Sequence, residues 1–484
     1  MKINWLPLAA AVALAAGSVS ASAVDFHGYF RAGAQLGTHG GEVYCLGNGN
    51  VGHKVGRLAD ECDTYGEAAL SQEVYNKANS KFTVNTLFAY GSTEGFRDLQ
   101  GNSWQGVGSG YNLSEEKKEG KTGKDDDYTY YKYGLKSDAS PWSGQRLSFR
   151  EMYAKYDTAD GYSIWAGKRF YQRKDIHIMD FYYLNNSGHG TGIENIDVGA
   201  GNLNFAVIKW ANSYDADAGE KFDGYNRNVY KLDARWNAIP VGFGTLDASV
   251  IYAFPAISDQ QKDAVKNDPR GNRGDSGVLL TLDHASTVGN ADGSFNLMNH
   301  LIFQWGTNGF GYVGTYGNHA GDNYTPDVDI VGVRLIDWGT MDFGSDIDLG
   351  YSLLWAHLDN GKNHESKGAA WTYTRSGWEY SIVVRPEYKW TEYTRTTLEL
   401  GYSQMKTTGW VTDPKYDDPN AYKFTLAQQF TPGKGFWSRP AIRFYTSYLG
   451  GKQFAHGWNT NYAEKNASHH NHQFTFGTQV EAWW

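Results

Sequence analysis

Aromatic and ionisable side chains recur together at alternate positions, the spacing that places residues on one face of a β-strand. Four of these rings are Tyr29, Tyr65, Trp437 and Trp483, and charged neighbours of matching parity include Arg31, Glu67 and Arg439. In one interpretation the rings only fill space. In the other they are flat apolar platforms beside charged hydrogen-bonding groups, which suit a solute with C–H faces and equatorial hydroxyls, such as a sugar.

Other short motifs resemble catalytic, nucleotide-binding or metal-binding sites, but the neighbouring residues that such sites need are missing. Residues 274–277 (GDSG) resemble a serine-protease nucleophile turn, but no partners for a triad are identifiable. Residues 47–52 (GNGNVG) fit a dinucleotide-binding spacing without the flanking strand and helix. Three histidines in 469–472 lack partners at ligand spacing, and Asp125–Asp127 favours a solvated loop over a calcium site. We therefore expect no catalytic residues, no metal and no cofactor.

The segment IWAGKRFYQRKDIHIMDFYY (164–183) changes character along its length. Up to Phe170 it is typical of a strand. Beyond Phe170, charges fall on both parities, which a lipid-facing strand would not tolerate; these residues are Arg173, Lys174, Asp175, His177 and Asp180. We expect a strand followed by a loop, and a loop dense in charges of both signs is a candidate constriction of a pore.

Residues 1–23 are typical of a secretory signal peptide, with Lys2, an apolar run and the small residues Ala21–Ala23 at the cleavage site. The apolar run is too short for a membrane helix, which needs about 20 residues. No later stretch reaches about 18 consecutive apolar residues, which excludes a helical membrane protein. The formal net charge of -9 at pH 7 argues against nucleic-acid binding.

Only two cysteines occur, Cys45 and Cys62. Because the signal peptide implies export to an oxidising compartment, we expect one disulfide that closes a surface loop. The alternative is two free thiols.

Both ends of the mature chain alternate with a period of two. Residues 24–36 place Phe26 and Phe30 opposite Tyr29 and Arg31, and residues 472–484 end with Trp484 on the apolar face and Trp483 on the polar face. Two such strands can pair and close a barrel, which leaves no open edge in lipid. A soluble sandwich or a β-helix shares this period, but the aromatic content of 15% fits the interfacial girdles of a membrane barrel.

The length of the chain indicates the size of the barrel. A repeat of about 25 residues, made of a strand, a short turn and a longer loop, gives roughly 18 strands. Residues 91–148 and 254–277 are typical of loops, and the first is long enough to be an insertion. No domain boundary is evident beyond the signal peptide, so residues 24–484 are expected to form one barrel.

The residues resemble the maltoporin family of sugar-specific outer-membrane porins. The matching motifs, in order along the chain, are VDFHGY (24–29), RL (57–58), ECDTYGE (61–67), FRE (149–151), WAGKRFYQR (165–173), MDFYY (179–183), ENIDVG (194–199), RPEYKWT (385–391), TLAQQF (425–430), WSRPAIR (437–443) and the closing WW. The resemblance implies an all-β, 18-stranded antiparallel transmembrane barrel, assembled as a homotrimer in the lipid of the outer membrane. It also implies passive diffusion of maltose and maltodextrins.

The family lines its pore with an aromatic slide beside a polar track. The positions of this sequence that match the slide are Tyr29, Tyr65, Trp437 and Trp483. Those that match the track are Arg31, Arg57, Glu67, Arg150, Arg173, Asp175 and Asp180, with Tyr182 at the constriction. The loop with two cysteines matches as well.

The sequence departs from the family at two positions of the slide. Met298 takes the place of a phenylalanine, so that platform is missing or is supplied by Phe295. Trp104 is the candidate for a tryptophan that reaches in from a neighbouring subunit, and it lies in the insertion. Two rival functions stay open: a porin for another oligosaccharide, and a secreted polysaccharide-degrading enzyme with a pair of catalytic carboxylates.

Overall fold

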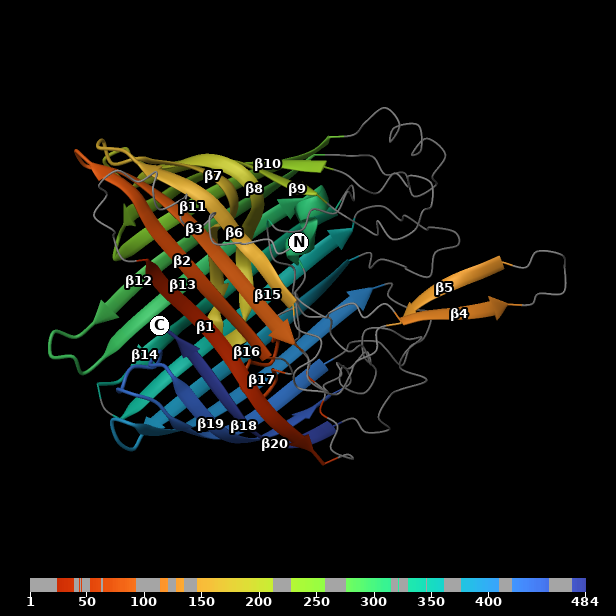
Figure 1. Cartoon of the computed structure of the whole chain (residues 1–484). Helices are drawn as coiled ribbons and strands as arrows, with labels where there is room; N and C mark the ends of the chain where they lie inside the picture. The colour runs from red at the N-terminus through yellow and green to blue at the C-terminus, as the bar shows by residue number, and fades with distance from the viewer. Residues whose placement is uncertain are drawn as a thin grey trace, which may run out of the picture.

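The computed structural model describes residues 24–38, 43, 45, 53–61, 64–92, 114–120, 128–134, 146–211, 228–256, 276–314, 321, 330–344, 346–360, 376–408, 420–451 and 472–484 (Figure 1). Within these residues, 18 antiparallel strands form one closed sheet, as predicted. The strands are β1 (Asp25–Gly37), β2 (Thr64–Lys77), β3 (Ser80–Ser92), β6 (Arg146–Asp157), β7 (Ser163–Ile176), β8 (Phe181–Asp197), β9 (Asn202–Ala211), β10 (Asn228–Val241), β11 (Gly244–Ala256), β12 (Gly277–Gly289), β13 (Asn296–Thr307), β14 (Ile330–Asp342), β15 (Ile347–Asn360), β16 (Ser376–Lys389), β17 (Thr394–Thr408), β18 (Asn420–Phe430), β19 (Ala441–Gly450) and β20 (His472–Trp483).

The two ends of the chain close the barrel. β1 pairs antiparallel with β20 on one side and with β2 on the other, and Tyr29 lies opposite Trp483. Closure leaves the sheet without an open edge. A barrel in lipid requires this, because an unpaired backbone group there has no water to bond and costs several kcal/mol.

Apolar side chains lie on the outer face of the strands and polar side chains on the inner face, the reverse of the arrangement in a soluble protein. On β18, Phe424 and Leu426 are 50% and 44% exposed on the outer face, while Lys423 and Thr425 are buried on the lumen side. Residues 422–430 therefore alternate between the outer face and the lumen. Since the exposed face is apolar, it suits contact with hydrocarbon rather than water.

Aromatic rings gather near both rims of the outer face. Those near one rim include Trp236, Phe243, Phe343, Tyr388, Trp390 and Tyr393; those near the other include Tyr230, Tyr252, Tyr380 and Tyr422. Such belts are expected at the two membrane–water interfaces. Trp484 belongs to the outer face, where its ring lies 5.5 Å from that of Phe26, centroid to centroid.

The connections between strands differ in length at the two rims. On one rim they run from two residues (78–79) to ten (431–440). On the other they run from 11 residues (409–419) to 53 (93–145), apart from the connection between β7 and β8. Outer-membrane barrels have short periplasmic turns and long extracellular loops, so we assign the first rim to the periplasmic side.

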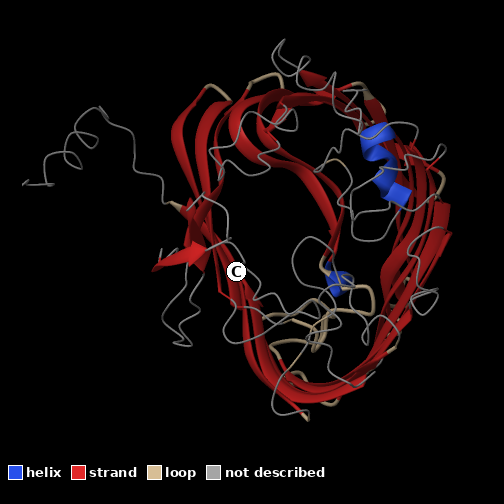
Figure 2. Cartoon of the chain, turned by 90° about the vertical axis from the view of Figure 1, so that its right-hand side faces the viewer, coloured by secondary structure: helices blue, strands red, loops and turns tan. Residues whose placement is uncertain are grey.

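The β7–β8 connection departs from the sequence prediction. β7 continues to Ile176, and a single 3-10 turn, η2 (His177–Met179), leads to β8, so the expectation of a loop after Phe170 is wrong. Figure 2, a view along the barrel, shows strands bending from the wall into the ring and a short helical turn inside it. Beyond the bend neither face of the hairpin meets lipid. Charged residues can therefore occupy both faces, as they do after Phe170.

The inward hairpin packs on the inner wall of the barrel. Ile178, Met179 and Phe181 form one apolar cluster with wall residues such as Ile302 and Ile336. A second 3-10 segment, η3 (Asn308–Gly314), adds Phe310 and Val313 to this cluster. The cluster lies against the inner wall along β10–β16, so the hairpin and η3 occupy part of the lumen.

The predicted loops differ in part from the structure. β3 extends to Ser92 and β6 begins at Arg146, and between them β4 (Ser114–Gly120) and β5 (Tyr128–Gly134) pair as a separate hairpin, where only a loop was expected. Figure 1 shows this hairpin projecting beyond the barrel. In the described part of the chain, no helix is long and apolar enough to cross a membrane.

Candidate functional site

Residues 53–61 bridge the barrel wall and the tip of the inward hairpin. On the wall side, the backbone N–H of Leu58 donates to the carboxylate of Glu399 on β17, at 2.9 Å. On the hairpin side, the backbone N–H of Arg57 donates to the carbonyl oxygen of Ile178, at 3.0 Å. This segment is therefore held on both sides and places charged side chains beside η2.

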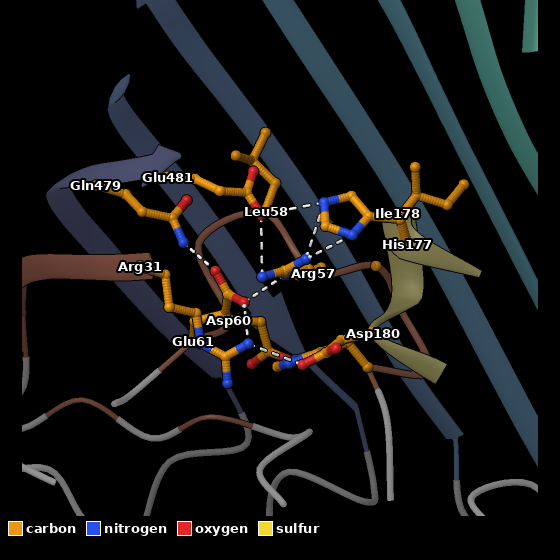
Figure 3. Close-up of polar contacts among 12 residues, drawn as sticks. Arg31, Arg57, Leu58, Asp60, Glu61, His177, Ile178, Asp180, Gln479 and Glu481 are labelled. Atoms are coloured by element: carbon orange, nitrogen blue, oxygen red, sulfur yellow. Dashed lines mark hydrogen bonds and ion pairs between the residues drawn. The ribbon is translucent and has the colours of Figure 1, made fainter. Parts of the chain in front are cut away.

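A network of buried charges surrounds Arg57 (Figure 3). Its guanidinium lies 3.0 Å from the carboxylate of Glu481 and also bonds to Glu61. Glu481 in turn lies 2.9 Å from Arg439 and 3.0 Å from Arg443. One carboxylate thus compensates three guanidinium groups, and its removal would leave them without their shared partner.

Arg31 connects this network to the hairpin. Its guanidinium lies 2.9 Å from the Asp180 carboxylate and 3.2 Å from Glu61. Burial alone would raise the pKa of Asp180, but Arg57 and Arg31 outweigh burial and hold that pKa below its ordinary value. Asp180 therefore stays ionised. The structure brings together three predicted residues of the polar track, Arg31, Arg57 and Asp180.

Sequence reasoning missed Glu61 and Glu481, and it named His177 only as one of the charges of a candidate constriction. Glu481 shares the parity of Trp483, which was a usable signal. Glu61 and His177 lie on segments that enter the lumen and are not strands of the wall. No local sequence pattern predicts that these two segments approach each other. The Arg57 guanidinium lies 3.1 Å from Nδ1 and 3.0 Å from Nε2 of the His177 ring, and the Glu481 carboxylate lies 3.1 Å from Nε2.

A second group of predicted residues lies around Tyr182. The Arg173 guanidinium lies 4.1 Å from the centroid of the Tyr182 ring, a cation–π contact. Tyr65 donates its hydroxyl hydrogen to Glu67, and the Arg31 guanidinium lies 5.3 Å from the Tyr65 ring. Charged side chains therefore lie against the rings of Tyr182 and Tyr65.

Two further candidates for the polar track, Arg150 and Asp175, make fewer polar contacts with the described residues. Arg150 lies on β6 with its Nε buried and without a hydrogen-bond partner among the described residues. Asp175 is half-buried on β7, and no hydrogen bond or ion pair joins it to another described residue. Their roles stay predictions.

The four predicted rings form a line that His177 completes. Tyr29 and Tyr65 have centroids 6.2 Å apart, and Tyr29 lies opposite Trp483 in the β1–β20 register. The His177 ring lies 5.1 Å from Trp483 and 5.6 Å from Trp437, edge-on to both. All four predicted rings are half-buried, so each keeps part of its surface accessible. Rings that only filled space would be expected to be covered.

Trp437 reaches this line by a different route from the one predicted. Its parity with Arg439 and Arg443 assumed a strand, but residues 431–440 are the turn before β19, so that premise is wrong. The turn folds Phe436 into the lumen, where its ring lies over Gly350, and Trp437 follows it toward His177.

The remaining predicted residues have mixed outcomes. Met298 lies on the lumen-facing parity of β13. Phe295 lies in the β12–β13 turn, where its ring is 5.9 Å from that of Phe343, so it does not join the line. Cys45 is buried. Trp104 and Cys62 lie outside the described residues, and the disulfide stays a prediction.

His53, Glu61 and Asp180 lie close enough to one another to hold a metal ion. However, Arg31 lies within ion-pair distance of both carboxylates, and His53 bonds to Asp60 at 3.0 Å. A cation would have to compete with a guanidinium for the same oxygens. We therefore interpret the group as part of the charge network.

The comparisons with known proteins agree with this architecture. A family model described as LamB porin matches residues 24–484. A protein named Maltoporin, from Hahella chejuensis (strain KCTC 2396), is 32% identical over 487 residues, which cover 99% of this chain and 97% of the relative.

Solved porin structures resemble the chain more weakly. Acinetobacter baumannii OccAB1 is 11% identical, with 96% of this chain and 98% of that chain covered and a TM-score of 0.48. A BenF-like porin from Pseudomonas fluorescens Pf-5 is 10% identical, with 96% and 99% covered and a TM-score of 0.47. These scores are too low to carry an argument. The family model and the Maltoporin relative, each matched along nearly the whole chain, show that the chain belongs to the LamB porin family.

Proposed function

We propose that this protein is a sugar-selective channel of the outer membrane, through which maltose and maltodextrins diffuse passively along the aromatic line. The observation that carries the proposal is the row Tyr65, Tyr29, Trp483 and Trp437, half-buried and flanked by charged side chains. Several weak, similar sites in a row suit conduction better than one tight site, because a solute must also leave.

The balance of charge around the line supports a neutral solute. Arg57 and Arg439 share Glu481, and Arg31 shares Asp180 and Glu61. Because these charges compensate each other locally, the site offers directional hydrogen bonds without a strong net field. Sugar hydroxyls can use such bonds, whereas an ionic solute would meet groups of both signs.

The same pairing argues against the rival enzyme. A glycosidase needs one carboxyl group held protonated and a second one free to act as base or nucleophile. Here Asp180, Glu61 and Glu481 each lie against at least one guanidinium, so all three carboxylates are already engaged in ion pairs. We therefore infer transport without catalysis.

Current block in a planar bilayer tests the proposal. The purified protein should conduct ions, and maltodextrins should block the current reversibly. Trp437→Ala should weaken this block about two- to tenfold, since aromatic packing contributes about 0.5–1.5 kcal/mol, and should leave open-channel conductance largely intact. Trp390→Ala is the matched control, because that tryptophan is 62% exposed on the outer face of the barrel, near the periplasmic rim.

Three outcomes separate the rivals. Steady current that no sugar affects would refute the sugar channel. Stronger block by sucrose than by maltose and longer maltodextrins would favour a porin for another oligosaccharide. Release of reducing ends from a polysaccharide would favour the enzyme.

The pH dependence of block tests the state of His177. Burial and the Arg57 guanidinium lower the pKa of His177 below its ordinary value of 6.5, although Glu481 opposes them. The ring is therefore neutral at and above that pH. Sugar block should stay constant from about pH 8 to about pH 6.5 and change only below. Since the folded pKa lies below the unfolded one, this group removes stability as the pH falls below about 6.5.

Several finer features remain proposals. We expect cleavage of the signal peptide near Ala23, a Cys45–Cys62 disulfide, assembly as a homotrimer and a contribution of Trp104 from a neighbouring subunit. The family resemblance and the sequence support them.

A further inference from the structure

Two rings on the lumen side of β13 and β14 extend beyond the predicted line. His300 and Trp338 lie opposite each other in the β13–β14 register. Their rings stack with centroids 4.8 Å apart and planes 9° from parallel. Both share the parity of the buried lumen residues on their strands, and both are half-buried, so part of the stack is accessible from the lumen.

This pair continues the aromatic line past Trp437. Trp338 and Trp437 pack against the same apolar cluster. Phe436 belongs to that cluster and covers Gly350, where an added Cβ would lie 2.4 Å from its ring. Gly350 lies opposite Thr340 on β14, two residues from Trp338. Apolar ring surface therefore leads from Trp437 over Phe436 toward Trp338.

A contact with the Asp283 carboxylate on the neighbouring strand β12 fixes the orientation of the His300 ring. Its Nδ1 lies 2.9 Å from the Asp283 carboxylate, which also accepts from Lys174 at 2.7 Å and from the Tyr183 hydroxyl at 2.8 Å. With Nδ1 as the donor to Asp283, Nε2 on the far side of the ring can accept a hydrogen bond. Within the described residues, His300 has no other hydrogen-bond partner.

We propose that Trp338 and His300 form a further sugar platform, the next contact for a maltodextrin that already covers Trp483 and Trp437. The proposal rests on the proposed function and deepens it. Trp338 supplies ring surface for the C–H face of a glucose unit, and Nε2 of His300 accepts from a hydroxyl. This platform takes the place of the ring that Met298 lacks, two residues away on the same face of β13.

A length series tests the proposal, because short sugars can occupy Trp483 and Trp437 without reaching the pair. Trp338→Ala should weaken block by long maltodextrins about two- to tenfold, the range expected for one aromatic platform. Block by maltose should change less. Trp338→Phe keeps a ring and should restore most of the block by long sugars.

Controls separate this inference from the function on which it rests. Phe295→Ala should leave block by every sugar unchanged, because that ring packs in a turn. Unchanged block by long maltodextrins in Trp338→Ala, with weakened block in Trp437→Ala, overturns the platform and leaves the sugar channel standing. An equal loss for maltose and long sugars also overturns it, because that would indicate a general distortion. A wild-type channel that no sugar blocks refutes the proposed function itself.

Discussion

Replacement of Glu481 by Gln should cause the largest loss of sugar binding among single substitutions in the lumen. The Glu481 carboxylate lies 2.9–3.0 Å from the guanidinium groups of Arg57, Arg439 and Arg443. Glutamine keeps the shape but removes the charge. Breaking a buried pair in this way costs about 3–5 kcal/mol, because the other charges stay buried without compensation.

The consequence for the channel follows from what these guanidinium groups do. Arg439 lies 4.3 Å from the centroid of the Trp483 ring, and Arg57 bonds to Tyr29. Glu481→Gln should therefore disturb two platforms at once and weaken sugar block roughly tenfold or more, since one hydrogen bond to a charged group contributes about 1.5–3 kcal/mol. The extra positive charge should also shift ion selectivity toward anions.

Bilayer recordings with salt gradients and sugar titrations measure both effects. Glu194→Gln is the matched control. Glu194 is also buried and pairs with Arg169 at 2.5 Å and with Gln172 at 2.8 Å, and neither partner belongs to the aromatic line. If the two variants lose sugar block equally, the effect reflects the general cost of an unpaired guanidinium and not the position of Glu481.

The wall of the barrel was predictable because each strand carries its own signal. Successive residues of β18 point to opposite sides of the wall. The alternation of apolar and polar residues therefore assigns Phe424 to the outer face and Lys423 to the lumen without any tertiary information. The same pattern at the two ends of the chain predicted the β1–β20 closure, and it separated Trp483 from Trp484 correctly.

The contents of the lumen were less predictable, because they depend on segments that leave the wall. Residues 171–176 lose the period of two once neither face meets lipid, so a continuing strand looked like a loop. Trp437 was assigned to the lumen by a parity that does not apply to a turn. Glu61 and His177 contact Arg57 because the fold brings their segments together. The spacing of residues within either segment does not predict these contacts.

Replacement of Gly401 by Ala should release residues 53–61 from the inner wall without removing any charge. A Cβ at Gly401 on β17 would lie 2.0 Å from the carbonyl oxygen of Val55. The obstacle is backbone rather than the end of a flexible side chain, so the segment must move away from β17. Overpacking of this kind costs about 1–3 kcal/mol, less than the loss of a buried charge.

The displaced segment carries Arg57 and Glu61, which hold the network around the aromatic line. Their shift should widen the constriction, so open-channel conductance should rise while sugar block weakens roughly tenfold, as expected when a hydrogen bond to a charged group is lost. This combination distinguishes displacement from a general loss of folded protein, which would lower the number of channels and leave the conductance of each one unchanged.

Gly66→Ala is the matched control, because an added Cβ there would lie 3.6 Å from its nearest neighbours, an ordinary contact distance. Gly66 lies on β2 between Tyr65 of the aromatic line and Glu67 of the predicted polar track, so this variant adds the same methyl group beside two predicted site residues. It should keep the wild-type conductance and sugar block. If Gly401→Ala also keeps both, residues 53–61 do not set the constriction, and the narrowing must come from the other segments that enter the lumen, such as the β7–β8 hairpin and η3.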